Sequence, residues 1–463
     1  MQLGTDLLAL AYLVSATLFI LGLKGLTHPA SARRGNYYAM AGMILAVAAT
    51  LLNPAMKSYS FIVAGVLLGA VIGTVIALKI KMTAMPQLVA LLHSFVGLTA
   101  VLVAVGTYYD RAVLGSPDPV LMTELFIGAF IGAITFTGSL VAFGKLQALL
   151  SSKPLVFKGQ HQVNLVVSLV AVTCGIEFVM HDNLLALFIM LALALLLGIL
   201  LIVPIGGADM PVVVSMLNSY SGWAATATGF TLENNLLIIT GALVGFSGAI
   251  LSYIMSRAMN RSIVSIILGG FGGGGGSDQA VAVAADRRVK TASVEDAVFL
   301  MANASKVIIA PGYGMAVAQA QHALKELMDL LESKGVNIRF AIHPVAGRMP
   351  GHMNVLLAEA DVPYDRVFEM DEINPEFSTA DVVIVVGAND VTNPAAKSEK
   401  SSPIYGMPIL DVYKARQVFF IKRSMSPGYS GVDNLLFYQD NCALIFGDAK
   451  KVCENMAAEL RSV

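Results

Sequence analysis

The sequence is short of cysteine and of charge. Its three cysteines, Cys174, Cys442 and Cys453, have the spacing of neither a disulfide framework nor a metal site, so we expect free thiols and no metal. Charged residues make up 13% of the 463 positions, whereas about a quarter of an average soluble chain is charged. The formal net charge of −1 argues against a nucleic-acid partner.

We also expect no cleavable N-terminal signal. The first apolar run, residues 7–23, follows Asp6 rather than a basic segment, and no small-residue cleavage site comes after it. We therefore predict that this run is a membrane span. Because 56% of the chain is hydrophobic, much of it is expected to face the lipid bilayer, as in a polytopic membrane protein.

Apolar runs near the roughly 20 residues that cross ~30 Å of hydrocarbon recur through the first part of the chain. They predict an α-helical bundle of about nine spans, at residues 7–23, 37–52, 60–78, 86–105, 121–143, 163–180, 184–203, 211–230 and 236–255. The connections after even-numbered spans hold two basic residues, Lys57 and Arg111. Those after odd-numbered spans hold ten: Lys24, Arg33, Arg34, Lys79, Lys81, Lys145, Lys153, Lys158, Arg257 and Arg261. This bias predicts an N-terminus outside and a C-terminal part in the cytoplasm or an organelle matrix.

A glycine-rich segment then separates two kinds of sequence. Residues 269–276 are nearly all glycine, and a small, polar stretch continues to about residue 293. A glycine-rich chain of some 20 residues has an end-to-end distance of roughly 25 Å, so it tethers two domains without fixing their orientation. We predict a transmembrane domain at residues 1–262, a flexible linker at 263–292 and a second domain at 293–463.

In the second domain, strand-like apolar runs alternate with helical stretches. The predicted strands are residues 307–310, 337–342, 366–370, 382–386, 418–421 and 443–446, and the clearest helix is 315–333. This alternation predicts an α/β fold with a doubly wound parallel sheet. Ligands in such a fold bind beyond the carboxyl ends of the strands, where this sequence concentrates its glycine, proline and polar residues.

The first predicted strand leads into Gly312-x-Gly314-x-x-Val317, a pattern typical of dinucleotide sites. Gly312 permits a tight turn, Gly314 lets a phosphate approach the backbone, and the next helix offers unpaired N–H groups. The motif alone is a weak signal, but the strand before it and the helix after it favour a functional site. The second strand ends in His343-Pro-Val-Ala-Gly-Arg348 and lacks the carboxylate that would bind the ribose hydroxyls of NAD. This absence favours NADP.

A basic pair closes the fifth predicted strand. Lys422, Arg423 and the hydroxyl of Ser424 open a loop that contains a Pro-Gly pair and ends at Gly431. Two cations and a hydroxyl at the carboxyl end of a strand suit a phosphate monoester. The alternative is an ordinary solvated Lys-Arg pair, and the position in the predicted fold favours the phosphate.

Several motifs together resemble one protein family. In the second domain they are Gly312-Tyr-Gly-Met-Ala316, His343-Pro-Val-Ala-Gly-Arg-Met-Pro-Gly351, Gly387-Ala-Asn-Asp390, Gly406-Met407 and Lys422-Arg-Ser-Met425. In the apolar part they are Leu91-Leu-His-Ser-Phe-Val-Gly97, Gly206-Gly-Ala-Asp-Met-Pro211 and Ser215-Met-Leu-Asn-Ser-Tyr-Ser-Gly222. These motifs look like those of the beta subunit of proton-translocating nicotinamide nucleotide transhydrogenase, and the resemblance covers essentially the whole chain.

The resemblance implies direct hydride transfer between NADH and NADP⁺, without a catalytic side chain and coupled to inward proton movement. It implies that NADP(H) binds this chain while NAD(H) binds a partner alpha subunit, in a heterotetramer of two alpha and two beta subunits in the bacterial inner membrane. The residues that would line NADP(H) are Gly312, Tyr313, Gly314, Val345, Ala346, Gly347, Arg348, Met349, Pro350, Gly387, Ala388, Asn389, Asp390, Gly406, Met407, Lys422, Arg423, Ser424, Met425, Ser426, Pro427, Gly428, Tyr429, Asp448 and Ala449.

The resemblance also suggests separate roles within this set. Lys422 and Arg423 would hold the 2′-phosphate, and Arg348 would meet the pyrophosphate. Asp390 would lie near the nicotinamide. The loop that ends at Tyr429 resembles a lid over the bound nucleotide.

Three polar residues of the apolar part are candidates for proton translocation. His93 lies mid-span and can bind a proton near neutral pH, which favours a functional site over the alternative of a neutral histidine that bridges two helices. Asn218 suits interhelical hydrogen bonding as well as a proton wire, and only the resemblance favours the wire. Asp209 lies at the cytoplasmic mouth of the eighth span, where an ordinary solvated carboxylate is equally compatible with the sequence.

Two other functions fit the same layout. An ion transporter gated by a cytosolic nucleotide-sensing domain would also combine a helical bundle with a dinucleotide fold. A membrane-tethered dehydrogenase with its own substrate would need a further acid or base and a substrate pocket, and one dinucleotide fold nearly fills the second domain.

Overall fold

The computed structural model of the chain describes residues 5–26, 29–53, 58–112, 118–151, 154–269, 289–400, 402, 404–426, 428 and 430–462. The chain divides into two compact units. The first comprises Met1–Phe143, Lys158–Ile202 and Met216–Ile250, and the second comprises Gly144–Phe157, Val203–Ser215 and Leu251–Val463. Most of the predicted linker lies outside the described residues, as do Lys57, Lys153, Pro427 and Tyr429.

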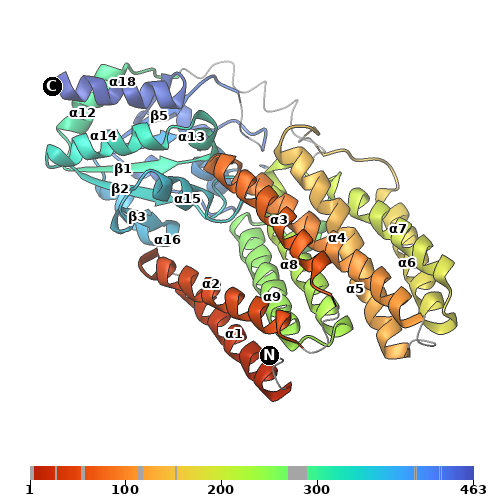
Figure 1. The fold of residues 1–463 in the computed structure, drawn as a ribbon. Coiled ribbons are helices and arrows are strands. Elements are labelled where there is room, and N and C mark those ends of the chain that lie inside the picture. Colours follow the sequence, from red (N-terminus) through yellow and green to blue (C-terminus); the bar gives the residue numbers. More distant parts are fainter. Residues whose placement is uncertain are drawn as a thin grey trace. The chain divides into compact units, whose positions relative to one another are not determined.

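Nine long helices occupy the apolar part of the described chain (Figure 1). They are α1 (Thr5–Leu26), α2 (Pro29–Leu51), α3 (Ser60–Lys79), α4 (Met85–Ala112), α5 (Pro119–Leu146), α6 (Gln160–His181), α7 (Leu184–Ile202), α8 (Met210–Thr231) and α9 (Asn235–Ala258). Each predicted span overlaps one of them. Seven of the described helices are long and apolar enough to cross a bilayer, and α2 and α8 are not among the seven. The prediction of a polytopic helical bundle is confirmed, with an approximate number of spans.

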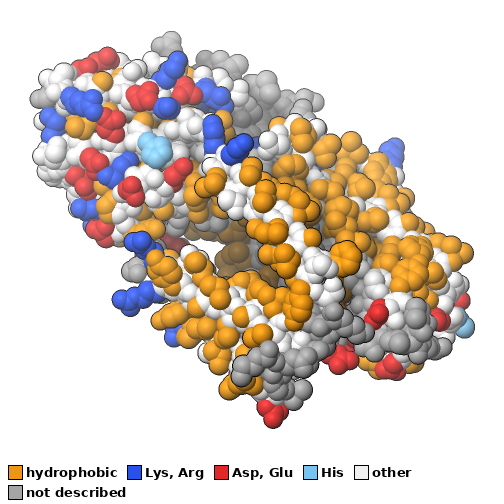
Figure 2. Space-filling model, viewed as in Figure 1, with side chains coloured by type: hydrophobic (Ala, Val, Ile, Leu, Met, Phe, Trp, Pro, Cys, Tyr) orange, Lys and Arg blue, Asp and Glu red, His pale blue; other side chains and the backbone are white. Residues whose placement is uncertain are grey.

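Glycine allows neighbouring membrane helices to approach closely. A Cβ atom on Gly97 of α4 would lie 2.6 Å from the carbonyl oxygen of Gly132 on α5, and one on Gly222 of α8 would lie 2.2 Å from the nitrogen of Gly245 on α9. No other residue fits these crossings without a shift of the backbone, which is the usual role of small residues between membrane helices. On the face shown in Figure 2, apolar side chains cover much of the surface of these helices.

The second unit contains a six-stranded parallel sheet. Its strands are β1 (Lys306–Pro311), β2 (Asn337–Ile342), β3 (Val367–Glu369), β4 (Val382–Val386), β5 (Gln417–Lys422) and β6 (Cys442–Phe446), in the order β3-β2-β1-β4-β5-β6. All pairs are parallel, with Val307 opposite Ile338 on one side of β1 and opposite Val382 on the other. All six predicted strands and the doubly wound fold are confirmed. The order reverses between β1 and β4, which is where nucleotides bind in this fold.

Apolar cores cover both faces of the sheet. One core joins β1, β2 and β4 to α12 (Val294–Ala302), α14 (Gln321–Ser333), α15 (His352–Glu359) and α18 (Ala449–Ser462). The other is built from shorter elements that include α16 (Met370–Ile373), η5 (Asn374–Thr379), η7 (Val412–Lys414) and η8 (Leu435–Tyr438). The remaining short helices are η1 (Met82–Ala84), η2 (Gly207–Asp209), α10 (Ile263–Leu268), η4 (Tyr364–Arg366), η6 (Asp390–Thr392) and α17 (Ala395–Ser398).

The predicted helix at residues 315–333 is wrong in one respect. The structure has two helices there, α13 (Tyr313–Ala318) and α14, separated by Gln319 in the left-handed conformation at φ 54°. Neither glycine nor proline marks this break, so the apolar spacing runs through it and reads as one helix. Both segments bury their apolar side chains in the same core.

Candidate nucleotide-binding site and buried membrane histidine

Three glycines form the junction between the ends of β1 and β4. The Gly312 amide donates to the Val386 carbonyl and the Gly314 amide to the Gly387 carbonyl, each over 2.9 Å. A Cβ atom on Gly312 would lie 2.4 Å from the Cα of Ala388, and one on Gly314 would lie 2.6 Å from the Cα of Gly387. The backbone of Gly312 is extended. Glycine is therefore required at this position by the close contact with Ala388, and not by the tight turn that we predicted.

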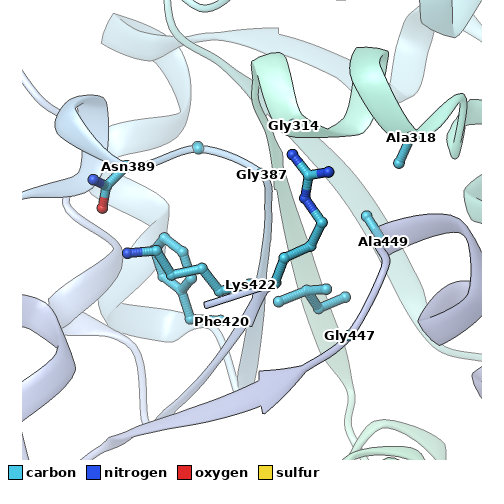
Figure 3. Close-up of a pocket in the computed structure, with 11 residues that line it drawn as sticks. Gly314, Ala318, Gly387, Asn389, Phe420, Lys422, Gly447 and Ala449 are labelled. Carbon is cyan, nitrogen blue, oxygen red and sulfur yellow. The ribbon is translucent and has the colours of Figure 1, made fainter. Parts of the chain in front are cut away.

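A pocket opens beside this junction, at the carboxyl ends of β1, β4, β5 and β6 (Figure 3). Its lining combines small residues, glycine and alanine, with two larger apolar side chains, two cations and one amide. These residues are Gly314, Ala318, Gly387, Ala388, Asn389, Phe420, Ile421, Lys422, Arg423, Gly447 and Ala449. Seven of the residues predicted for the nucleotide are therefore together here. The crevice lies at the switch point of the sheet, as the fold predicts.

Two buried nitrogen atoms in this pocket have no hydrogen-bond partner within the described part of the chain. They are Nζ of Lys422 and Nδ2 of Asn389. The Lys422 ammonium lies 4.4 Å from the centre of the Phe437 ring, and burial lowers its pKa while Asp433 and Asp390 oppose that shift. Figure 3 shows Lys422 reaching toward the side of the pocket on which Asn389 lies.

Hydrogen bonds from Asn434 fix the position of the Asn389 side-chain amide. Its backbone and side-chain oxygens each accept a hydrogen bond of 3.1 Å from Nδ2 of the fully buried Asn434. The Asn389 nitrogen therefore faces away from Asn434. Unsatisfied buried donors are costly in a folded protein, so this pair of nitrogens suits an anionic or acceptor-rich ligand.

The loop after Lys422 is fastened over the Asn389–Asp390 turn. Oδ1 of Asp390 accepts a hydrogen bond of 2.7 Å from the Ser430 hydroxyl, and Oδ2 accepts one of 3.1 Å from the Ser430 amide. A Cβ atom on Gly428 would lie 2.6 Å from Nδ2 of Asn389. Burial raises the pKa of Asp390, and the two bonds from Ser430 oppose that shift. Ser424 and Ser426 bond to each other in the exposed part of this loop.

The loop after β2, residues 343–351, carries six predicted site residues. Ala346 is buried in the core, while Arg348 places its guanidinium carbon 4.4 Å from the centre of the Tyr313 ring. Nη1 of Arg348 donates a hydrogen bond of 2.7 Å to the carbonyl oxygen of Leu146. Val345, Gly347, Met349 and Pro350 complete this loop; none of the six lines the pocket beside Lys422.

The other predicted residues lie in two further segments. Gly406 has φ +79° and precedes Met407, whose side chain is buried in a small apolar cluster with Ala395 and Ile409. Oδ1 of Asp448 accepts hydrogen bonds from the backbone amides of Lys450 and Lys451 at the start of α18. Ala449, the first residue of that helix, lines the pocket.

In the membrane unit, His93 of α4 meets α8. Its Nδ1 lies 3.2 Å from the hydroxyl oxygen of Ser221, and that hydroxyl donates a hydrogen bond of 2.8 Å to the Asn218 carbonyl. The Ser221 oxygen is then the acceptor for an Nδ1 proton on His93. The other ring nitrogen, Nε2, is buried and has no partner in the described structure. The structure thus joins His93 and Asn218 through a residue that we did not predict.

Asp209 belongs to the second unit and is not a solvated carboxylate. It is 8% exposed, and its two carboxylate oxygens lie 2.6 and 2.7 Å from Nη1 of Arg261. This ion pair joins η2 to the chain that follows α9. The solvated alternative from the sequence is therefore wrong, because the carboxylate is buried and paired with Arg261.

Sequence reasoning missed two groups of polar residues. Ser221 lies three positions after Asn218 and so on the same side of α8, a spacing that could have identified it. Ser430 and Asn434 lie 40 or more positions from the turn that they hold, at Asn389 and Asp390, and no local pattern indicates such contacts.

Comparison with known proteins covers nearly the whole chain. The model of the family described as "NAD(P) transhydrogenase beta subunit" matches residues 8–459. A protein named "NAD(P) transhydrogenase subunit beta" from Rhodospirillum rubrum is 59% identical over 451 residues, which cover 96% of this chain and 97% of that protein. A protein of the same name from a defined strain of that species matches to the same extent.

Proposed function

Because the chain belongs to the NAD(P) transhydrogenase beta subunit family, we propose that it binds NADP(H) and exchanges hydride with NAD(H) held by an alpha subunit. Hydride transfer from NADH to NADP⁺ is coupled to inward proton movement across a bacterial inner membrane. Two alpha and two beta subunits form the working enzyme. The N-terminus lies outside, and the α/β domain lies in the cytoplasm.

The pair of unpartnered nitrogens at the strand switch point carries this proposal. Lys422 and Asn389 offer buried donors beside the exposed cation Arg423, and Gly314 and Gly387 of the β1–β4 junction line the same pocket without side chains. A nucleotide with an extra phosphate supplies acceptors for those donors. The same set suits NAD less well, because NAD has no 2′-phosphate.

Each part of the site has a distinct task in the proposed reaction. Lys422 and Arg423 bind the 2′-phosphate, and Arg348 binds the pyrophosphate. Asp390 fastens the loop above the site through Ser430 and so excludes water from the reacting face. The bound nicotinamide itself supplies the hydride chemistry, so the chain needs no catalytic acid or base.

The proton half of the reaction is assigned to His93. Its free Nε2 can accept a proton, while Ser221 and Asn218 hold the other side of the ring. A single charge that moves through 100 mV releases about 2.3 kcal/mol, enough to shift a hydride equilibrium roughly 50-fold. Asp209, paired with Arg261, is proposed to relay the protonation of His93 from the membrane helices to the nucleotide site.

The test is an assay of NADPH-dependent reduction of an NAD analogue. Membranes that contain this chain together with an alpha subunit should be active, and membranes with either subunit alone should not. Hydride transfer by the purified chain without a partner would show that it is not half of a two-subunit enzyme. Nucleotide-dependent ion flux without any hydride transfer, in the presence of the alpha subunit, would instead indicate a gated transporter.

A further inference from the structure

Two buried histidines stand at the ends of the loop that follows β2. His343 is 1% exposed and His352 is 0% exposed. Nε2 of His343 donates a hydrogen bond of 2.8 Å to the Pro408 carbonyl, and its Nδ1 accepts one of 3.2 Å from the Val345 amide. His343 therefore ties the beginning of the loop to a second loop of the domain.

His352 holds the same loop farther along. Its Nδ1 accepts a hydrogen bond of 3.1 Å from the backbone amide of Arg348. An imidazole that accepts at Nδ1 carries its proton at Nε2 when neutral. That second nitrogen is buried and has no partner among the described residues. A leucine would avoid the cost of this unsatisfied N–H group, so the acceptor at Nδ1 is the property that requires histidine here.

The packing around His352 leaves the Arg348 backbone little freedom. Gly347 has φ +111°, and a Cβ atom on it would lie 2.6 Å from the Cβ and 2.7 Å from Nδ1 of His352. The His352 ring also lies 6.4 Å from the Tyr313 ring, over which the Arg348 side chain is placed. Arg348 is thus held by His352 at its amide, and by the Tyr313 ring and the Leu146 carbonyl oxygen at its guanidinium.

We propose that His352 is a positioning residue for NADP(H): by holding the Arg348 amide, it sets where Arg348 meets the pyrophosphate. This inference rests on the proposed function, in which Arg348 binds that group. His352 itself has no contact with the nucleotide, and its effect passes through Arg348. Removal of the acceptor should weaken binding of ligands that carry a pyrophosphate and spare ligands that do not.

The experiment uses the full chain in detergent with two ligands. NADP⁺ carries both the 2′-phosphate and the pyrophosphate, whereas adenosine 2′-monophosphate carries the 2′-phosphate alone. Titration calorimetry, with displacement of NADPH for the weaker ligand, measures both affinities. His352→Leu removes the acceptor, and His352→Asn keeps an acceptor oxygen near the position of Nδ1. Met353→Leu is the matched control, because Met353 is equally buried on α15 and contributes only apolar packing to the core.

His352→Leu should weaken NADP⁺ binding about tenfold, as expected for one lost hydrogen bond, and change binding of adenosine 2′-monophosphate by less than about twofold. His352→Asn and Met353→Leu should bind both ligands nearly as the wild type does. Equal weakening of both ligands, or no weakening of NADP⁺, would overturn the positioning role. A wild-type chain that does not bind NADP⁺ would instead overturn the proposed function.

Two further variants keep the inference testable if His352→Leu does not fold. Gly347→Ala pushes against the His352 ring and should give the same selective loss of NADP⁺ affinity. In an Arg348→Gln background, His352→Leu should cause no further loss, because its route through Arg348 is already gone. Independent, additive effects of the two substitutions would contradict the proposal, as would unchanged NADP⁺ affinity in Arg348→Gln alone.

Discussion

Aliphatic side chains dominate both α3 and β4, but those of α3 are not buried whereas those of β4 are. None of the described residues of α3 is buried, and all five residues of β4 are. Lipid solvates an apolar helix as well as a protein core does, so a membrane helix gains little by turning its side chains inward. A strand such as β4, aliphatic on both faces of a parallel sheet, must be covered on both sides in water, and that requirement produces the two cores of the α/β domain.

Glycine is used differently in the two regions as well. In the membrane unit it lies where two regular helices cross, as at Gly222 and Gly245. In the α/β domain it lies where two loops meet beside a pocket, as at Gly314 and Gly387. The first use brings two helices together, and the second brings two loops together at the edge of the pocket.

Buried histidines show the same contrast. His343 and His352 each accept a hydrogen bond from a loop amide at Nδ1, so they stabilise a particular backbone conformation. His93 contacts a serine hydroxyl on a neighbouring helix, and its Nε2 has no hydrogen-bond partner among the residues that the structure describes. The domain histidines thus stabilise loops, whereas the membrane histidine is the residue to which we assign the proposed proton site.

Loss of His93 should have the largest effect. His93→Ala should abolish proton pumping and reverse transhydrogenation while NADP(H) binding to the α/β domain persists, because in the proposed mechanism a single titratable site links the proton to the hydride. Proteoliposomes with the alpha subunit would be given NADPH and an NAD analogue, and internal pH would be followed. His181→Ala is the control, since His181 is largely exposed at the end of α6 and pairs with Glu177. Pumping at the wild-type rate would reduce His93 to a helix-bridging residue.

Removal of the basic pair should erase most of the preference for NADPH over NADH. Bonds from charged groups to a phosphate contribute about 1.5–3 kcal/mol each, so the Lys422→Ala, Arg423→Ala double variant should lose about a hundredfold or more in discrimination. Calorimetry on the full chain measures both affinities.

Arg416→Ala provides the matched control for this charge change. Arg416 precedes β5, and its exposed side chain pairs with Asp381. The substitution therefore removes a cation from the end of the strand opposite Lys422. It should leave nucleotide preference unchanged. Undiminished preference in the double variant would place the 2′-phosphate elsewhere.

Alanine at the two kinds of glycine contact should be similarly destabilising. Gly222→Ala would put a Cβ atom 2.2 Å from the Gly245 nitrogen, and Gly387→Ala would put one 2.4 Å from the Gly314 Cα at φ +68°. Each should lower the free energy of unfolding by about 3 kcal/mol, and Gly387→Ala should also reduce NADP⁺ affinity. Chemical denaturation and calorimetry report the two effects.

Two glycines with no atoms near an added Cβ serve as controls, Gly106 for the helical Gly222 and Gly335 for Gly387 with its positive φ. A Cβ atom on Gly106 of α4 or on Gly335 meets nothing within 4 Å. Gly106→Ala should be neutral or stabilising by up to about 1 kcal/mol, and Gly335→Ala should cost about 1 kcal/mol because φ is +86°. If Gly222→Ala were as mild as Gly106→Ala, the helix crossing would not depend on close approach.

The smallest expected effect is a change in the pH dependence of stability. Burial lowers the pKa of His343 and of His352 to about 4, from an ordinary value of 6.5. The unfolded chain therefore binds more protons between pH 4 and 6.5. The stability from each neutral ring is fully present above pH 6.5 and is lost toward pH 4, at up to about 1.4 kcal/mol per pH unit.

His352→Asn removes one of these two groups while keeping its acceptor. The slope of unfolding free energy against pH should then be shallower by up to about 1.4 kcal/mol per pH unit between pH 4.5 and 6. Urea unfolding of the wild-type and variant chains at several pH values provides the comparison. Parallel curves would mean that the His352 ring already carries a proton in the folded chain.

Local patterns in the sequence predicted the repeating elements well. Apolar runs identified each long membrane helix, and β-like runs identified all six strands, because burial in lipid or in a sheet selects side chains residue by residue. The break at Gln319 escaped this reasoning, since the apolar spacing continues across it. The individual nucleotide contacts and the proton pathway remain predictions from the resemblance.

By itself, the sequence determined that a lipid-facing helical region precedes a parallel α/β domain, because composition and periodicity are properties of neighbouring residues. Only the tertiary structure decided which polar groups meet. His93 and Ser221 are 128 positions apart, and Asp209 and Arg261 are 52 apart. Such pairs form because packing brings distant segments to one place, where a buried polar group needs a hydrogen-bond partner, a condition that no local pattern encodes.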